Sequence, residues 1–153
     1  MIQFPIVAEN EIDEREGGGQ KEIIIKTILI DCGKTFREGA IRWFPHFDIR
    51  SVDFVVLTHG HADALFGIDD LRSTRDKEDK APIPCYQSKE CELVTRGIFP
   101  YLYPRQRIEG EEVRFVANID WREITPFILF EPVPGLAIYP LPVEHGTVRF
   151  TFI

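Results

Sequence analysis

The most constraining feature of the sequence is a short apolar run that leads directly into a polar loop. Residues 52–57 (VDFVVL) are mostly apolar and are bounded by polar residues, a pattern that predicts a strand covered on both faces. The next segment, residues 58–64 (THGHADA), is small and polar, and Leu65, Ile68 and Leu71 then recur at helical spacing. The sequence therefore predicts a strand, a polar loop and a helix, in that order.

The polar loop carries three side chains that can bind a metal. His59, His61 and Asp63 alternate along it, and alternate side chains of an extended backbone project to the same side. We therefore expect two imidazoles and one carboxylate to converge beyond the strand, a donor set that suits zinc, iron, nickel or copper. His145 ends another apolar run and qualifies as a third imidazole, whereas His46 is expected at the surface without a site role. The alternative is that the paired histidines are ordinary surface residues.

Further strands and helices are predicted on both sides of this loop. Residues 8–22 combine acidic side chains with three consecutive glycines, so we expect an exposed loop or hairpin tip there. Strands are expected at residues 2–7, 23–31, 83–86, 113–117, 127–130 and 136–143. Two helices are expected, an amphipathic one over residues 36–44 that Pro45 ends, and one from an N-cap at Ser88 to about Phe99.

Composition limits the size of the fold and the kind of partner. With 153 residues, the chain has room for a single domain, expected over residues 1–153. Its formal net charge is -7, so the chain lacks the net positive charge that usually attracts nucleic acid or anionic membranes. A local basic groove stays open as an alternative to a solvated surface, because four arginines lie close together in the sequence: Arg96, Arg105, Arg107 and Arg114.

Cysteine usage and the N-terminus indicate the compartment. Three cysteines, Cys32, Cys85 and Cys91, are too few for a disulfide framework, so we expect free thiols with structural roles in a reducing compartment. The N-terminus lacks the cationic and apolar regions of a signal peptide. The longest apolar stretch is also too short to cross a bilayer. We therefore expect a cytoplasmic protein with no membrane association.

The polar loop and several other segments together resemble a known family. THGHADA after VDFVVL resembles the HxHxDH signature of the metallo-β-lactamase superfamily. The wider pattern is similar to the branch of cyclic-phosphate phosphodiesterases and tRNA 3′-processing nucleases, and it covers residues 28–146. Its segments are ILIDCGKTFREGAIRWFP, LTHGHADALFGIDDLR, APIPCYQSKE, FPYLYP and LPVEHG. The resemblance implies an α/β fold, a partial αββα sandwich that contains mainly the N-terminal βα half.

The resemblance also implies roles for individual residues. His59, His61 and His145 match the ligands of a first metal ion, and Asp63 matches a ligand of a second. Asp31 matches an acidic position near the metal loop, where it would orient the ligands; the alternative is a turn-forming role at the end of its strand.

The sequence departs from the family pattern at three places. Ala64 stands where the signature has its third histidine, so a second metal would lack a ligand. Only seven residues follow Gly146, and they include no aspartate or histidine to complete the family's ligand set. The opening strand and glycine-rich turn of the fold are also unclear. We therefore expect an incomplete domain with an exposed sheet face that favours association, and a homodimer that completes the site is one alternative.

Two nearby acidic residues could in principle replace the missing ligand. Asp69 and Asp70 follow Asp63 along the predicted helix, and seven helical residues advance about 10 Å. Because this distance is too long for one shared metal, we expect both to be helix-surface or loop residues, with Arg72 as a salt-bridge partner.

The function implied by the resemblance is metal-dependent hydrolysis. One zinc ion, with manganese or iron as alternatives, would activate a water molecule, and Asp63 would orient or deprotonate it. The expected substrate is a small phosphodiester or cyclic phosphate, because the acidic composition disfavours a long RNA. The alternative is a truncated, non-catalytic domain that binds a metal or a partner.

Overall fold

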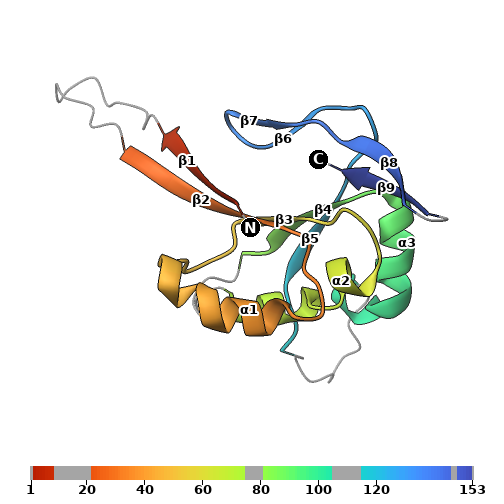
Figure 1. Ribbon diagram of the computed structural model, residues 1–153, viewed down its shortest axis with the longest axis horizontal. Coiled ribbons are helices and arrows are strands. Elements are labelled where there is room, and N and C mark those ends of the chain that lie inside the picture. Colours follow the sequence, from red (N-terminus) through yellow and green to blue (C-terminus); the bar gives the residue numbers. More distant parts are fainter. Residues whose placement is uncertain (1, 9–21, 75–80, 105–114, 146–147, 153) are drawn as a thin grey trace.

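A mixed five-stranded sheet forms the centre of the fold (Figure 1). In this computed structural model, the described residues are 2–8, 22–74, 81–104, 115–145 and 148–152, and the described side chains are those of residues 25–74, 81–104 and 115–144. The predicted strands at residues 2–7 and 23–31 pair as an antiparallel hairpin, β1 (Ile2–Ala8) and β2 (Glu22–Ile30). The acidic, glycine-rich segment between them lies almost entirely outside the described residues.

The other strands of this sheet run parallel to β2. They are β3 (Phe54–Val56), β4 (Ile83–Gln87) and β5 (Ile119–Glu123), so that the strands lie side by side in sequence order. Parallel neighbours need crossover connections, which helical segments normally supply. The carboxyl ends of β2, β3 and β4 consequently open at the same edge of the sheet.

Helical segments lie on one face of the sheet (Figure 1). The α-helices are α1 (Phe36–Trp43), α2 (Ala62–Leu65) and α3 (Lys89–Ile98), and the 3-10 turns are η1 (Pro45–Phe47), η2 (Ile68–Ser73) and η3 (Pro100–Leu102). Within the described part of the chain, no helix has both the length and the apolar character that crossing a bilayer requires.

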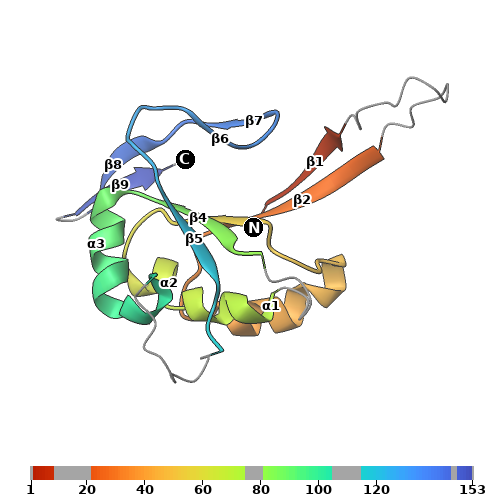
Figure 2. The ribbon, with the colours of Figure 1, turned by 180° about the vertical axis from the view of Figure 1, so that it is seen from behind.

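Two hairpins lie on the opposite side of the sheet, as the views from both sides show (Figures 1 and 2). One pairs β6 (Phe130–Val133) with β7 (Leu136–Ile138), and the other pairs β8 (Leu141–His145) with β9 (Val148–Phe152). The β8–β9 hairpin lies at the end of the molecule where α2 and α3 are found (Figure 1).

Apolar side chains pack on both faces of the central strands. In β3, Val55 belongs to the cluster on the helical side, while Phe54 and Val56 belong to the cluster that includes residues of the β6–β7 hairpin. The sequence neighbours Leu29 and Ile28 of β2 divide between the two clusters in the same way. Successive side chains of a strand point to opposite faces, so a strand covered on both sides must be apolar throughout. The buried strand predicted over residues 52–57 is therefore confirmed for Phe54–Val56, and Val52 and Leu57 on either side of it are also buried.

The helix predicted after the polar loop is interrupted. A single α-helical turn, α2, is followed by the 3-10 turn η2, and Gly67 lies between them. A Cβ on Gly67 would lie 2.3 Å from the carbonyl oxygen of Gly33, and the Gly67 N–H donates to the carbonyl of Cys32 at 2.8 Å. This close approach explains the break in the helix. The three apolar residues that suggested one continuous helix, Leu65, Ile68 and Leu71, are still fully buried.

Other details of the sequence prediction are also wrong. The strand expected at residues 127–130 begins only at Phe130, and the one expected at residues 136–143 is divided between β7 and β8. Residues 113 and 114 of the strand predicted at 113–117 lie outside the described residues, and residues 115–117 are not in a strand; β5 begins at Ile119. Phe115 is exposed, and the Ala117 N–H donates to the Asp69 carboxylate rather than to a strand. Trp43 shares the predicted apolar face of α1, yet it is 46% exposed and stacks on Phe47. The packed residues of that face are Phe36, Ala40 and Phe44.

The N-cap predicted for the third helix is confirmed and is open to a direct test. The Ser88 side chain accepts a hydrogen bond from the Cys91 N–H at 3.2 Å, and both residues are buried. Replacing a serine N-cap with alanine usually costs about 1 kcal/mol. We expect Ser88→Ala to lower the free energy of unfolding by about that amount in urea titrations. Ser88→Asp should restore most of it, and an unchanged midpoint in the alanine variant would contradict the assigned cap.

Candidate metal centre

The polar loop leaves the sheet at the carboxyl end of β3. Leu57 still bonds to the neighbouring strand through its N–H and the Tyr86 carbonyl at 2.8 Å, after which the chain turns into α2. His61 is the N-cap of α2, with an extended backbone (φ -78°, ψ 162°). Ligands of parallel α/β sheets commonly bind at this edge, beyond the carboxyl ends of the strands.

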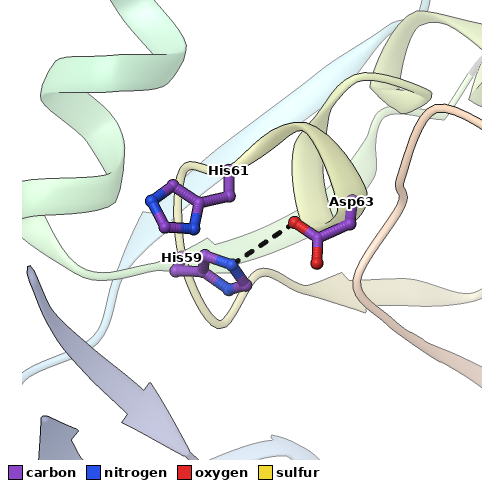
Figure 3. A group of neighbouring side chains, drawn as sticks. All are labelled: His59, His61 and Asp63. Atoms are coloured by element: carbon purple, nitrogen blue, oxygen red, sulfur yellow. Dashed lines mark ion pairs between the residues drawn. The ribbon is translucent and has the colours of Figure 1, made fainter. Parts of the chain in front are cut away.

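Three side chains come together at this edge (Figure 3). One ligand atom from each of His59, His61 and Asp63 lies within 4.8 Å of the others. The Nε2 atom of His59 is 3.7 Å from the Asp63 Oδ1 atom, and the two imidazole rings meet edge to face with centroids 4.8 Å apart. The three side chains thus converge as the alternating pattern predicts. The extended backbone expected for all three residues is only partly present, because Asp63 lies in the first turn of α2.

The cluster has a buried side and an open side. The His59 side chain is 15% exposed, whereas the Asp63 side chain is 79% exposed, and His61 is also exposed. A small ligand can therefore approach Asp63 and His61 from solvent, while His59 is held by the protein.

Asp31 and Thr58 hold His59 from the buried side. The carboxylate of Asp31 accepts hydrogen bonds from the Thr58 N–H at 2.8 Å and from the Thr58 hydroxyl at 2.7 and 2.9 Å. The same hydroxyl oxygen lies 2.8 Å from His59 Nδ1. Burial raises the pKa of the Asp31 carboxyl, and the hydrogen bonds from Thr58 and the nearby His59 oppose that rise.

Asp31 also forms the turn at the end of β2. Its φ of 61° lies in the left-handed region, which aspartate tolerates better than most residues. Its own N–H donates to the Val56 carbonyl at 2.9 Å. The two roles that the sequence left open for Asp31, a turn former and a residue bonded to the metal loop, thus coincide in the structure.

Two glycines allow the backbone around the cluster to pack closely. A Cβ on Gly33 would lie 1.8 Å from the carbonyl oxygen of Asp63, and a Cβ on Gly60 would lie 2.8 Å from the Val94 side chain of α3. The Cys32 N–H donates to the Ala64 carbonyl at 2.6 Å, close to Gly33. The start of α2 is thereby packed against the turn that follows β2.

The remaining histidines lie in different surroundings. His145 is the last residue of β8, where its backbone pairs with Val148. Its side chain lies outside the described part of the protein. His46 lies exposed in η1 and contacts the rings of Trp43 and Phe47.

The other acidic residues near the loop have structural partners. Asp69 accepts a hydrogen bond from the Ala117 N–H at 3.2 Å and forms a salt bridge with Arg72. Asp70 lies 3.7 Å from the same guanidinium. Ala64, where the family signature has a third histidine, is 1% exposed.

The donor set of the cluster fits a divalent transition metal. Imidazole nitrogen and carboxylate oxygen are both zinc ligands, and a zinc site needs three or four such donors around one point. The described residues offer three, of which His59 already has the carboxylate-linked hydrogen bond on its second nitrogen that metal-bound histidines usually have. Sequence reasoning missed Thr58 and Gly33; a hydroxyl directly before the first histidine and a glycine two residues after Asp31 are the signals that could have identified them.

Several known proteins are similar to this chain. A ribonuclease Z from Listeria innocua serovar 6a is 27% identical over 127 residues, which are 81% of this chain and 37% of that protein. An octanoyltransferase from Porphyromonas gingivalis is 31% identical over 121 residues, 79% of this chain and 22% of that protein. A crystal structure of a diphosphatase from the PhnP family superimposes with a TM-score of 0.63 and 26% identity, covering 84% of this chain and 45% of that one.

These relatives differ in name, and the chain spans less than half the length of each. Their names therefore do not decide its activity. The family is decided by a wider match, since residues 26–152 match the family model of the beta-lactamase superfamily domain. Together with the α/β architecture and the H-x-H-x-D cluster, this match confirms the resemblance found in the sequence: the chain belongs to the metallo-β-lactamase superfamily.

Proposed function

We propose that the protein is a metal-dependent hydrolase of a small phosphodiester or cyclic phosphate. One zinc ion would be held by the imidazoles of His59, His61 and His145, with a position left open for water and with Asp63 beside it. The observation that carries this proposal is the convergence of His59, His61 and Asp63 at the carboxyl end of β3. The relatives named ribonuclease Z and diphosphatase both bear names of enzymes that act on phosphate esters or anhydrides. The net charge of -7 favours a small substrate over a long RNA.

The proposed chemistry divides between the metal and the protein. A bound zinc ion would lower the pKa of water toward about 7 and would supply positive charge to offset the negative charge of the phosphate ester. The open side of the cluster admits the substrate. The Asp63 carboxylate is 79% exposed, so it can orient the attacking water or accept its proton.

Zinc is preferred over the alternatives because of the donor set. Neutral imidazole suits zinc, whereas manganese sites are richer in carboxylates and water. Two of the three described donors are imidazoles, and His145 would supply the third imidazole. Iron, which also accepts imidazole, is the closest alternative.

A second candidate function is a metal-binding module without turnover. It is favoured by Ala64, a buried methyl group at the position where the family signature carries a further ligand. The two candidates make different predictions once the metal is removed and returned.

Metal removal tests the proposal. We expect EDTA treatment followed by dialysis to reduce the hydrolysis of bis-p-nitrophenyl phosphate and of 2′,3′-cyclic nucleotides to the buffer rate. The activity should be lost because water in the apo site keeps its ordinary pKa. One equivalent of zinc should restore both activities. Stoichiometric zinc binding without turnover would support the second candidate, and hydrolysis that survives metal removal would contradict the proposed function.

A further inference from the structure

We propose that Thr58 is a positioning residue that selects the tautomer of His59, so that Nδ1 carries the proton and Nε2 presents its lone pair to the cluster. This inference is argued from the hydrogen-bond geometry. It rests on the proposed function only in assuming that the Nε2 lone pair of His59 binds the metal. The residues lie at the ends of two parallel strands, Asp31 after β2 and Thr58 shortly after β3.

The number of available protons decides the direction of each hydrogen bond. A threonine hydroxyl has one proton to donate, and an ionised carboxylate can only accept. The Thr58 oxygen lies 2.7 and 2.9 Å from the two Asp31 oxygens, so its proton points to Asp31. The contact of 2.8 Å with His59 must then be donated by Nδ1–H. A neutral imidazole with its proton on Nδ1 has its lone pair on Nε2.

Nε2 is the His59 nitrogen that faces the cluster, so its lone pair would be available to a metal ion held there. Nε2 is the His59 atom that lies 3.7 Å from the Asp63 carboxylate within the cluster. Thr58 itself is 6% exposed, and its backbone N–H also donates to Asp31. Because the hydroxyl directs its one proton between the two oxygens of the Asp31 carboxylate, it offers His59 an acceptor lone pair in a defined place.

The strand register explains why these groups meet. Ile30 of β2 lies opposite Val56 of β3, so Asp31 and the residues that follow β3 emerge at the same edge of the sheet. The Asp31 N–H bonds to the Val56 carbonyl at 2.9 Å, which holds the carboxylate beneath the loop. The pairing of β2 with β3 thus fixes the Asp31 carboxylate, and the Thr58 hydroxyl links that carboxylate to His59.

The test compares Thr58→Val with Thr58→Ser. Valine keeps the branched shape without the hydroxyl, whereas serine keeps the hydroxyl. In metal-free protein labelled with ¹⁵N-histidine, at a pH above the usual range of histidine titration, long-range ¹H–¹⁵N spectra distinguish the two tautomers. We expect His59 to carry its proton on Nδ1 in the wild type and in Thr58→Ser, and to shift toward the Nε2–H form in Thr58→Val.

Zinc affinity provides a second readout. Loss of a group that orients a metal-bound histidine typically weakens metal binding about 10- to 100-fold, so we expect a loss of that size in Thr58→Val. Thr58→Ser should bind zinc within about threefold of the wild type, a narrower change than loss of the orienting group produces. Urea unfolding of each variant separates this effect from general destabilisation.

The possible outcomes separate this inference from the proposed function. A wild-type protein with the His59 proton on Nε2 would overturn the inference even if Thr58→Val does not fold. An unchanged tautomer and zinc affinity in a folded Thr58→Val would overturn it as well. A wild type that shows the Nδ1–H tautomer but neither binds zinc nor hydrolyses phosphodiesters would retain the inference and contradict the proposed function.

Discussion

Replacing His61 with alanine is expected to abolish zinc binding and phosphodiester hydrolysis while leaving the fold intact. His61 supplies one of the three described donors, and zinc sites need three or four. Its loss should weaken zinc binding by more than the roughly 100-fold upper value typical of removing an orienting group. The fold should survive because His61 is exposed and its side chain makes no capping hydrogen bond to α2.

His46→Ala is the matched control for this experiment. His46 is also an exposed histidine in the described part of the chain, but it lies in η1 beside Trp43 and Phe47. The zinc affinity measured by equilibrium dialysis and the hydrolysis rate should therefore be the same for His46→Ala and the wild type. A His61→Ala variant that hydrolyses phosphodiesters at the wild-type rate would show that the cluster does not carry the reaction.

The second large effect is expected from Gly33→Ala. The added Cβ would lie 1.8 Å from the carbonyl oxygen of Asp63 and 2.4 Å from its carbonyl carbon. Backbone atoms cannot rotate away as a side chain can, so the start of α2 must move. Overpacking of this kind usually costs about 1–3 kcal/mol and occasionally more. The residue displaced is Asp63 itself, so zinc affinity should fall together with stability.

Gly39→Ala provides the comparison for Gly33→Ala. Gly39 lies inside α1, and a Cβ there would meet nothing within 4 Å. Alanine is favoured over glycine in a helix by about 0.5–1 kcal/mol, so this variant should be slightly stabilised in urea titrations and bind zinc normally. If Gly33→Ala matches the wild type in both measurements, the close packing of α2 against the turn after β2 is wrong.

The central strand and the metal loop could be predicted from the sequence because their signals are local. A strand covered on both faces is apolar throughout, as residues 54–56 are. His59, His61 and Asp63 are close enough in sequence that local backbone geometry brings them together. Ser88 could be recognised for the same reason, since an N-cap bonds within its own first turn.

The rest of the site depends on contacts between distant segments. Asp31 and Thr58 are 27 residues apart, and only the parallel register of β2 and β3 brings them together. The contact of Gly33 with Asp63 likewise depends on how α2 packs. The start of β5 at Ile119 is determined by pairing with Ile83 in β4, which the alternation of nearby apolar residues does not reveal.

Anomalous diffraction at the zinc absorption edge, on crystals of the protein grown with zinc, tests the metal centre most directly. The account predicts a peak among His59, His61 and Asp63, about 2.0–2.1 Å from a nitrogen of each of the two imidazoles, with the imidazole of His145 as the third ligand. Zinc absent from this loop, or bound only at other residues of the protein, would contradict it.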